Sequence, residues 1–272
     1  MPNANIFNST LSTTPAKTNS EFVNFISNSF VNNLGFTLVQ SIEGTIARRI
    51  LSYTYDATKV KGTVFLRVSC SSAGSLTYSI FDSWNTSTSS GTNESTEQNL
   101  SFSLESLDNN IVMTSYSHPE FKGVALSQDS SFCIVGIIRP VMIPTWWDEN
   151  IGLYAFLIRR ATSQATHLNL YTTTYNDTNR YNYVILYSDG METKQIVTGK
   201  YTLLCGLLIC SASNAILNSL RCGIIAKTSP DLAICANKLL APRDPLVVTA
   251  GVKEYENITP DTYTVGLAIR KV

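Results

Sequence analysis

Charged residues are scarce in this sequence: Asp, Glu, Lys and Arg together make up 15% of its 272 residues. Globular proteins usually carry about 25%. The 20 basic and 20 acidic residues balance, so the chain lacks the excess positive charge that binds nucleic acid or an anionic membrane surface. We therefore expect neither nucleic acid nor membrane as a partner. A neutral surface also lacks the repulsion that keeps copies of a protein apart.

Sequence signatures of catalysis and of cofactor binding are also missing. The chain contains no glycine-rich phosphate loop, no Gly-x-Ser-x-Gly turn, no acidic calcium loop and no Cys-x-x-Cys pair. His118 and His167 are its two histidines, and neither lies near a cysteine in the sequence. Either histidine could act as a base, but most histidines are surface or hydrogen-bonded residues. We predict a non-enzymatic protein without cofactor or metal.

Long apolar runs are absent as well. The longest apolar block, Leu203–Cys210, has eight residues, whereas a membrane-spanning helix needs about 20. We interpret this block as a buried strand. The first twenty residues contain two prolines and no apolar run, so we expect synthesis in a cytoplasm without a secretion signal. The six cysteines sit mostly in apolar runs, which favours buried reduced thiols over disulfides or a metal site.

The clearest local pattern in the sequence is that of a helix. Thr18 and Glu21 have the spacing of a capping box, in which each side chain binds the free backbone N–H of the other residue. Gly35 is placed to end the helix. Between them, five apolar residues recur at helical spacing: Phe22, Phe25, Ile26, Phe30 and Leu34. We predict one N-terminal amphipathic helix that packs on the protein's own sheet, with docking to a partner as the alternative.

After Gly35 the sequence pattern becomes that of strands. In Leu76–Phe81, large apolar and hydroxyl residues alternate, as in strands with one buried face. The first candidate strands are Phe36–Gln40, Ile46–Tyr55, Thr63–Ser71 and Leu76–Ser83. Residues 85–99 are polar and contain glycine, which predicts an exposed loop. Many short strands with polar turns indicate an all-β fold, a mainly antiparallel sandwich or barrel-like structure with one N-terminal helix.

Three segments are expected along the chain. Residues 1–17 are predicted to form an extended arm, and residues 18–160 a β-rich domain that includes the helix. Residues 161–272 form either a second β-rich domain or a continuation of the first. In that last part the run Tyr201–Ser211 predicts a single strand.

Five residues are candidate contacts for a glycan or for another protein: Trp84, Asn85, Trp146, Trp147 and Asp148. Tryptophan faces stack on sugar rings, and neighbouring acids bind sugar hydroxyls. Glycoside hydrolysis needs two facing carboxylates. The adjacent Asp148 and Glu149 would point to opposite faces of a strand, which disfavours them as such a pair. The favoured interpretation of the two tryptophans is a plug for the end of a β-core or a subunit contact, and a sugar-binding role for them is the alternative.

Two segments resemble virion structural proteins of tailed bacteriophages. The first, Phe22–Val39, is the predicted helix followed by Leu-Gly-Phe-Thr-Leu-Val. The second, Tyr78–Asn93, contains Trp-Asn-x-x-Thr-x-x-Gly-x-Asn. The resemblance covers the N-terminal half of the chain and transfers no active-site residues. It implies a component of the tail, baseplate or neck that is made in the host cytoplasm and ends up in the virion.

The leading hypothesis is therefore a structural component of a phage particle that acts through protein–protein contacts. Its expected partners are other virion proteins and further copies of itself, and the expected contact segments are residues 1–17 and 84–99. A receptor- or glycan-binding fibre or baseplate adhesin is the alternative, with a host surface glycan as its partner. A polysaccharide-cleaving enzyme is the least favoured hypothesis.

Overall fold

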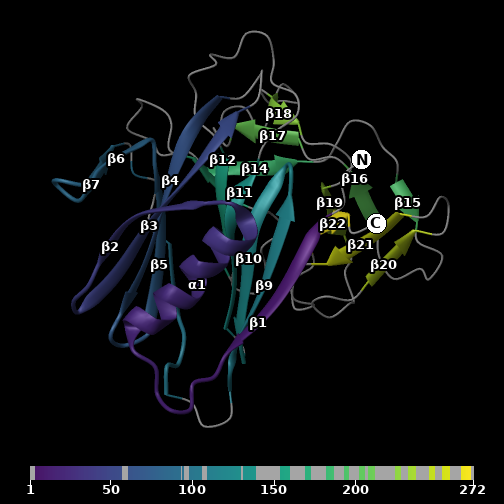
Figure 1. Ribbon diagram of the computed structural model, residues 1–272. Coiled ribbons are helices and arrows are strands. Elements are labelled where there is room, and N and C mark those ends of the chain that lie inside the picture. Colours follow the sequence, from purple (N-terminus) through teal and green to yellow (C-terminus); the bar gives the residue numbers. More distant parts are fainter. Residues whose placement is uncertain are drawn as a thin grey trace.

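The computed structural model describes residues 4–56, 61–92, 94, 98–105, 109–129 and 131–138, and beyond these the strands between Tyr154 and Arg270. Antiparallel sheets and one N-terminal helix make up this described part (Figure 1). The predicted fold class, mainly antiparallel and sandwich-like with one helix, is confirmed.

Helix α1 (Asn19–Leu34) lies where the capping pattern predicts it. The Thr18 side chain accepts a hydrogen bond from the Glu21 backbone N–H, and the Glu21 carboxylate accepts one from the Thr18 N–H at 2.8 Å. Gly35 follows the helix with a φ of 79°, a left-handed conformation that costs glycine least. Both predicted ends of the helix are thus confirmed.

A five-stranded sheet follows the helix. Its strands, in spatial order, are β2 (Thr37–Ile42), β3 (Ile46–Asp56), β4 (Lys61–Ser71), β5 (Ser75–Phe81) and β8 (Gln98–Ser101). All neighbours are antiparallel, and β3 and β4 pair over eleven residues each, from Ile46 opposite Ser71 to Asp56 opposite Lys61. Strands β2 to β5 therefore form consecutive hairpins, which need only local connections.

A nine-stranded sheet forms the second layer among the described residues. Its order is β1 (Asn5–Leu11), β9 (Ile111–His118), β10 (Phe121–Gln128), β11 (Ser131–Ile138), β12 (Tyr154–Arg159), β13 (Asn169–Thr172), β14 (Asn182–Leu186), β17 (Leu208–Ser211) and β18 (Ile224–Lys227). Strands from both sides of residue 160 belong to it, because Tyr154 of β12 pairs with Thr172 of β13. The first strand, β1, comes from the segment expected to be an extended arm.

A six-stranded antiparallel sheet lies beyond β1 in Figure 1. It consists of β15 (Thr193–Gln195), β16 (Thr202–Cys205), β19 (Leu232–Ala236), β22 (Val265–Arg270), β21 (Lys253–Asn257) and β20 (Pro245–Val248). The prediction of one strand for the run Tyr201–Ser211 is corrected here. The structure divides this run between β16 of the six-stranded sheet and β17 of the nine-stranded sheet, because an apolar run alone does not show where a chain changes sheets.

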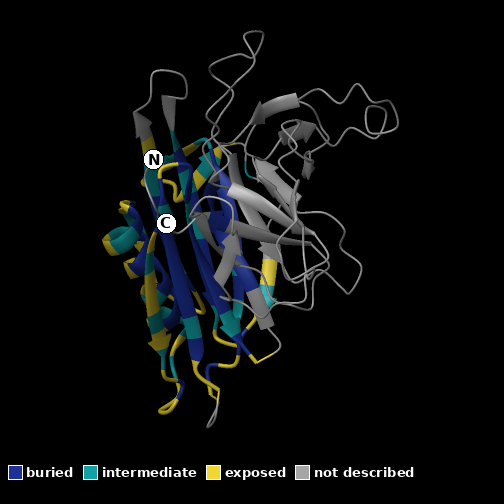
Figure 2. Cartoon of the chain, turned by 90° about the vertical axis from the view of Figure 1, so that its right-hand side faces the viewer, coloured by how far each residue is buried: buried dark blue, intermediate teal, exposed yellow. Residues whose placement is uncertain are grey.

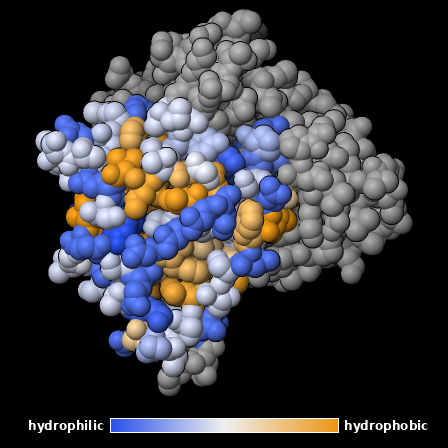
Figure 3. Space-filling model, viewed as in Figure 1, coloured by the Kyte–Doolittle hydropathy of each residue, from blue (hydrophilic) through white to orange (hydrophobic). Residues whose placement is uncertain are grey.

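The main core lies where α1, the five-stranded sheet and the nine-stranded sheet meet. Buried residues follow the inner strands of both sheets (Figure 2). The helix contributes Phe22, Ile26 and Phe30, which are fully buried, so its apolar side packs on the chain's own sheets as predicted. The exposed residues of α1 (Glu21, Asn24, Asn28 and Asn32) are all polar, and they form a mostly blue stripe in Figure 3. This is the expected distribution for an amphipathic helix.

Candidate functional site

A hairpin projects from the edge of the five-stranded sheet (Figure 1). It consists of β6 (Ser83–Asn85) and β7 (Ser90–Thr92), joined by the turn 86–89. The expectation that residues 85–99 form a loop is corrected here, since β7 and part of β8 lie in this range. The short strands carry mainly hydroxyl residues and lack the alternating apolar pattern by which a strand is recognised.

An aromatic cluster fixes the base of the hairpin. Phe81 is 1% exposed, and its ring meets the Trp84 ring edge-to-face with centroids 5.1 Å apart. The Arg67 guanidinium carbon lies 5.2 Å from the Phe81 ring centroid, within the range of a cation–π contact. Gly91 on β7 lies against the same ring, since a Cβ there would be 2.2 Å from Phe81 Cδ1. Only glycine lets the hairpin approach this ring so closely.

Polar contacts reinforce the same base. The Asp82 N–H donates to the Thr92 carbonyl at 3.1 Å, and the Ser83 and Thr92 hydroxyls lie 2.7 Å apart. Arg67 Nη2 donates to the Glu94 carboxylate at 2.5 Å. Both side chains of this ion pair are partly exposed, so its contribution is about 1 kcal/mol or less. The contacts of Asp82 and Ser83 with Thr92 close the base of the hairpin. The Arg67–Glu94 ion pair joins the segment after the hairpin to β4.

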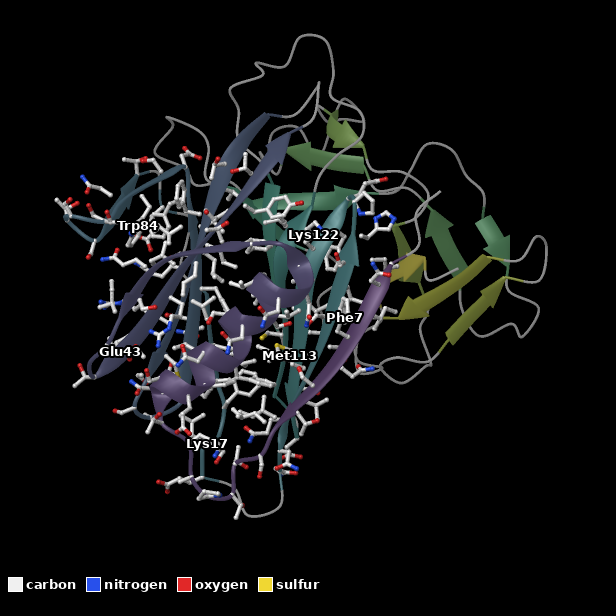
Figure 4. All side chains as sticks on the ribbon, viewed as in Figure 1. Phe7, Lys17, Glu43, Trp84, Met113 and Lys122 are labelled. Atoms are coloured by element: carbon white, nitrogen blue, oxygen red, sulfur yellow. The ribbon has the colours of Figure 1, made fainter. Side chains whose placement is uncertain are left out.

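Gln40 of β2 anchors the outer part of the hairpin to the sheet edge. Its Oε1 accepts a hydrogen bond from the indole Nε1 of Trp84 at 2.8 Å. Its Nε2 donates to the Thr86 carbonyl at 3.2 Å and to the Ser89 hydroxyl at 2.9 Å. One amide side chain therefore contacts both ends of the turn and the strand before it. Figure 4 shows Trp84 on the hairpin side of the molecule.

The tip of the hairpin is exposed and internally ordered. Asn85 Oδ1 accepts hydrogen bonds from the backbone N–H groups of Ser87 at 2.9 Å and of Thr88 at 3.4 Å, which is the way asparagine stabilises a turn. The Thr88 and Ser90 hydroxyls are 2.7 Å apart. Residues 85–90 are all exposed. The result is an uncharged, hydroxyl-rich surface with a defined shape.

The predicted contact residues have different outcomes. Trp84 and Asn85 come together in the hairpin, but as supports: Trp84 is partly buried with its N–H bound to Gln40, and Asn85 holds the turn. Trp146, Trp147 and Asp148 lie outside the described residues. Sequence reasoning missed Gln40, because its bond to Trp84 joins positions 44 residues apart. A polar residue in a strand at the edge of a sheet is the only local signal.

Two thiols and one phenol of the core are held in uncharged form. Burial raises the pKa of the Cys70 thiol and that of the Cys133 thiol to about 12 each. The Tyr78 hydroxyl lies 3.9 Å from Cys133 Sγ, and burial, followed by the charge of Cys133, raises the pKa of this phenol well above its ordinary value. Reactive cysteines need a lowered pKa and access to solvent. Both cysteines are buried free thiols, the state predicted for the cysteines of this chain, although only Cys133 of the two lies in an apolar run.

Half-buried Lys122 of β10 lies between the two sheets (Figure 4). Its Nζ donates to the Ser117 hydroxyl at 3.0 Å and lies 5.7 Å from the centroid of the Tyr53 ring. Burial lowers the pKa of the Lys122 ammonium. The Lys122 ammonium thus contacts Ser117 of β9 and Tyr53 of β3. It links the nine-stranded sheet to the five-stranded sheet.

Metal clusters are absent from the described residues: no group of three or more His, Cys, Asp or Glu side chains is arranged there to hold an ion. Within the same part of the chain, no helix has the length and apolar character needed to cross a membrane. Compared with known proteins, the chain matches no protein-family model and no curated protein sequence.

Proposed function

We propose that this protein is a structural component of a tailed-phage particle and acts through protein–protein contacts, with the β6–β7 hairpin as one contact surface. One observation carries the proposal. The segment Tyr78–Asn93, which resembles virion structural proteins, contains the anchored hairpin Ser83–Thr92. The sequence resemblance and the projecting surface therefore coincide.

The energetics of binding support a contact role for such a hairpin. Ordering a flexible loop upon association costs free energy, about 0.5–1.5 kcal/mol for each immobilised side chain. Here Gln40, Phe81 and the Asn85 turn already hold the backbone. The exposed hydroxyls of Ser87 and Thr88 carry no charge, so covering them costs less than covering an ion, provided that the partner supplies hydrogen bonds to them.

The test is the composition of purified particles. Cells that produce particles are supplied with the wild-type chain, with Ser87→Arg at the hairpin tip, or with the matched control Asn28→Arg on the exposed face of α1. Quantitative mass spectrometry of the particle fraction should find the wild type and Asn28→Arg in equal amount and Ser87→Arg reduced about tenfold or more. Absence of the wild-type protein from the particles would overturn the proposal. Equal incorporation of all three proteins would show that the β6–β7 hairpin is not a contact surface in the particle.

A further inference from the structure

Among the described strands, none pairs with one of the two edges of β1. Strand β1 pairs with β9 over its full length, from Asn5 opposite Ser117 to Leu11 opposite Ile111. No other strand of the described part of the chain pairs with it. In an antiparallel pair, every second residue of such an edge strand directs its N–H and C=O groups away from the sheet, where another strand can bind them.

This edge lacks the usual protection against pairing with another chain. Charged side chains, proline or a bulge normally provide that protection. The seven residues of β1, NIFNSTL, include no charge and no proline, and the register with β9 is regular throughout. The matching edge strand of the other sheet, β2, has a bulge between Leu38 and Gln40 and is tied to the β6–β7 hairpin. Of these two edges, β1 is the unprotected one.

An exposed aromatic side chain lies on the same strand. Phe7 is 39% exposed, and with Leu38 and Ile46 it makes up the exposed large hydrophobic residues of the described chain. Phe7 is opposite Ser115, whose hydroxyl bonds to Ser29 of α1. Phe7 therefore lies on the face of the sheet that carries α1, beside the open edge (Figure 4). A strand added at this edge would cover it.

We infer that a second copy of this chain pairs antiparallel with β1 about a two-fold axis at Asn8. An uncharged strand brings no like charges together when it pairs with itself. The outward-facing N–H and C=O groups of one copy must meet those of the other, and every second residue carries them. A residue at the two-fold axis is therefore opposite its own copy. Asn8 is the central residue of β1, so we place the axis there. This register aligns all seven residues and places Phe7 opposite Ser9 of the second copy.

The symmetry also gives Phe7 a partner. In this register the two Phe7 side chains are diagonal neighbours on one face, at about 7–8 Å between backbone positions, which is within the reach of aromatic rings. The two nine-stranded sheets continue into each other, with α1 on the same face in both copies. This surface is separate from the hairpin, and the inference holds whether or not the protein belongs to a particle.

Site-specific disulfides test the register directly. In the paired strands, the two Asn8 Cα atoms are about 4.5–5.5 Å apart, a separation that a disulfide spans. The two Thr10 residues are about 13 Å or more apart along the strands, because each is opposite Ile6 of the other copy. Asn8 and Thr10 are both exposed and lie on the same strand. Asn8→Cys should form a reducible covalent dimer upon mild oxidation, and Thr10→Cys should give only the wild-type background.

Sedimentation of the full chain gives a second, independent readout. The wild type should sediment as a dimer at micromolar concentration, and Phe7→Lys should raise the dissociation constant about a hundredfold, because two cations then meet at the axis. Leu38→Lys, the matched control at the β2 edge, should sediment as the wild type does. A monomeric wild type, equal weakening by both variants, or cross-linking of Thr10→Cys as strong as that of Asn8→Cys would each overturn the inference.

Discussion

Gly91 shows how a single residue shapes the hairpin surface. Its missing side chain leaves room for the Phe81 ring, which would otherwise clash with a Cβ at 2.2 Å. Gly91→Ala should therefore lower the free energy of unfolding by about 1–3 kcal/mol, as overpacking usually does. Urea unfolding measures the change, and Ser87→Ala at the exposed tip is the control, with an effect within about 0.5 kcal/mol. Equal stability of Gly91→Ala and the wild type would show that β7 does not rest on the ring.

The buried thiols give a second prediction at the residue scale. Because burial raises the pKa of Cys70 and of Cys133 to about 12, almost no thiolate is present near neutral pH, and the sulfurs are also shielded. Iodoacetamide labelling followed by peptide mass spectrometry should leave both residues unmodified in the folded protein and modify both in denaturant. Rapid labelling of either cysteine without denaturant would contradict the described core.

The ends of α1 act at the scale of the element. The Thr18 side chain accepts a hydrogen bond from a backbone N–H that the first helical turn leaves without a partner, and the Glu21 carboxylate accepts one from the Thr18 N–H. Thr18→Ala should cost about 1 kcal/mol of unfolding free energy. The comparison variant is Asn28→Ala on the exposed face of the helix, which should be neutral or slightly stabilising because alanine favours helices more than asparagine does. Thermal or chemical unfolding measures both changes. If Thr18→Ala loses no more unfolding free energy than Asn28→Ala, the cap does not stabilise the helix.

Arg49 joins the helix to the first hairpin of the five-stranded sheet. This β3 side chain is 3% exposed, and its guanidinium donates to Asn24 Oδ1 at 2.8 Å, to the Ser20 hydroxyl at 3.2 Å and to the Glu43 carboxylate at 2.5 Å. The Ser20 hydroxyl also bonds to Glu43. The hydrogen bond from Ser20 and the charge of Arg49 hold the pKa of Glu43 below its ordinary value, while burial opposes them.

This contact predicts a pH dependence of stability. A carboxyl group with a lowered pKa in the folded state contributes its full stabilisation above the ordinary value of 4.5. The contribution is lost as the pH falls through the lowered value, because the protonated carboxyl no longer forms the ion pair. Since Glu43 is 59% exposed, solvent screening limits the effect to about 1 kcal/mol or less. Urea titrations across the acidic range should show a shallower pH dependence for Glu43→Gln than for the wild type, and identical slopes would contradict the assignment.

At the scale of the whole molecule, sequence reasoning succeeded where local patterns determine the structure. Thr18, Glu21 and Gly35 define α1 without reference to any other part of the chain. The start of β3 at Ile46 and the end of β4 at Ser71 lie where the sequence predicts them. No alternating pattern predicts β9, since six of its eight residues are buried. The Gln40–Trp84 bond depends on how the fold brings distant positions together, which no local pattern contains.

The shape of the hairpin before any partner binds is the central claim, and hydrogen–deuterium exchange of the isolated protein tests it most directly. In the wild type the backbone amides of Ser83–Thr92 should exchange far more slowly than those of an unstructured peptide, because Gln40 and the Phe81 cluster hold both strands. Gln40→Ala should accelerate exchange in this segment and leave β4 and β10 unchanged. Exchange of the wild-type hairpin at the rate of an unstructured peptide would contradict the account.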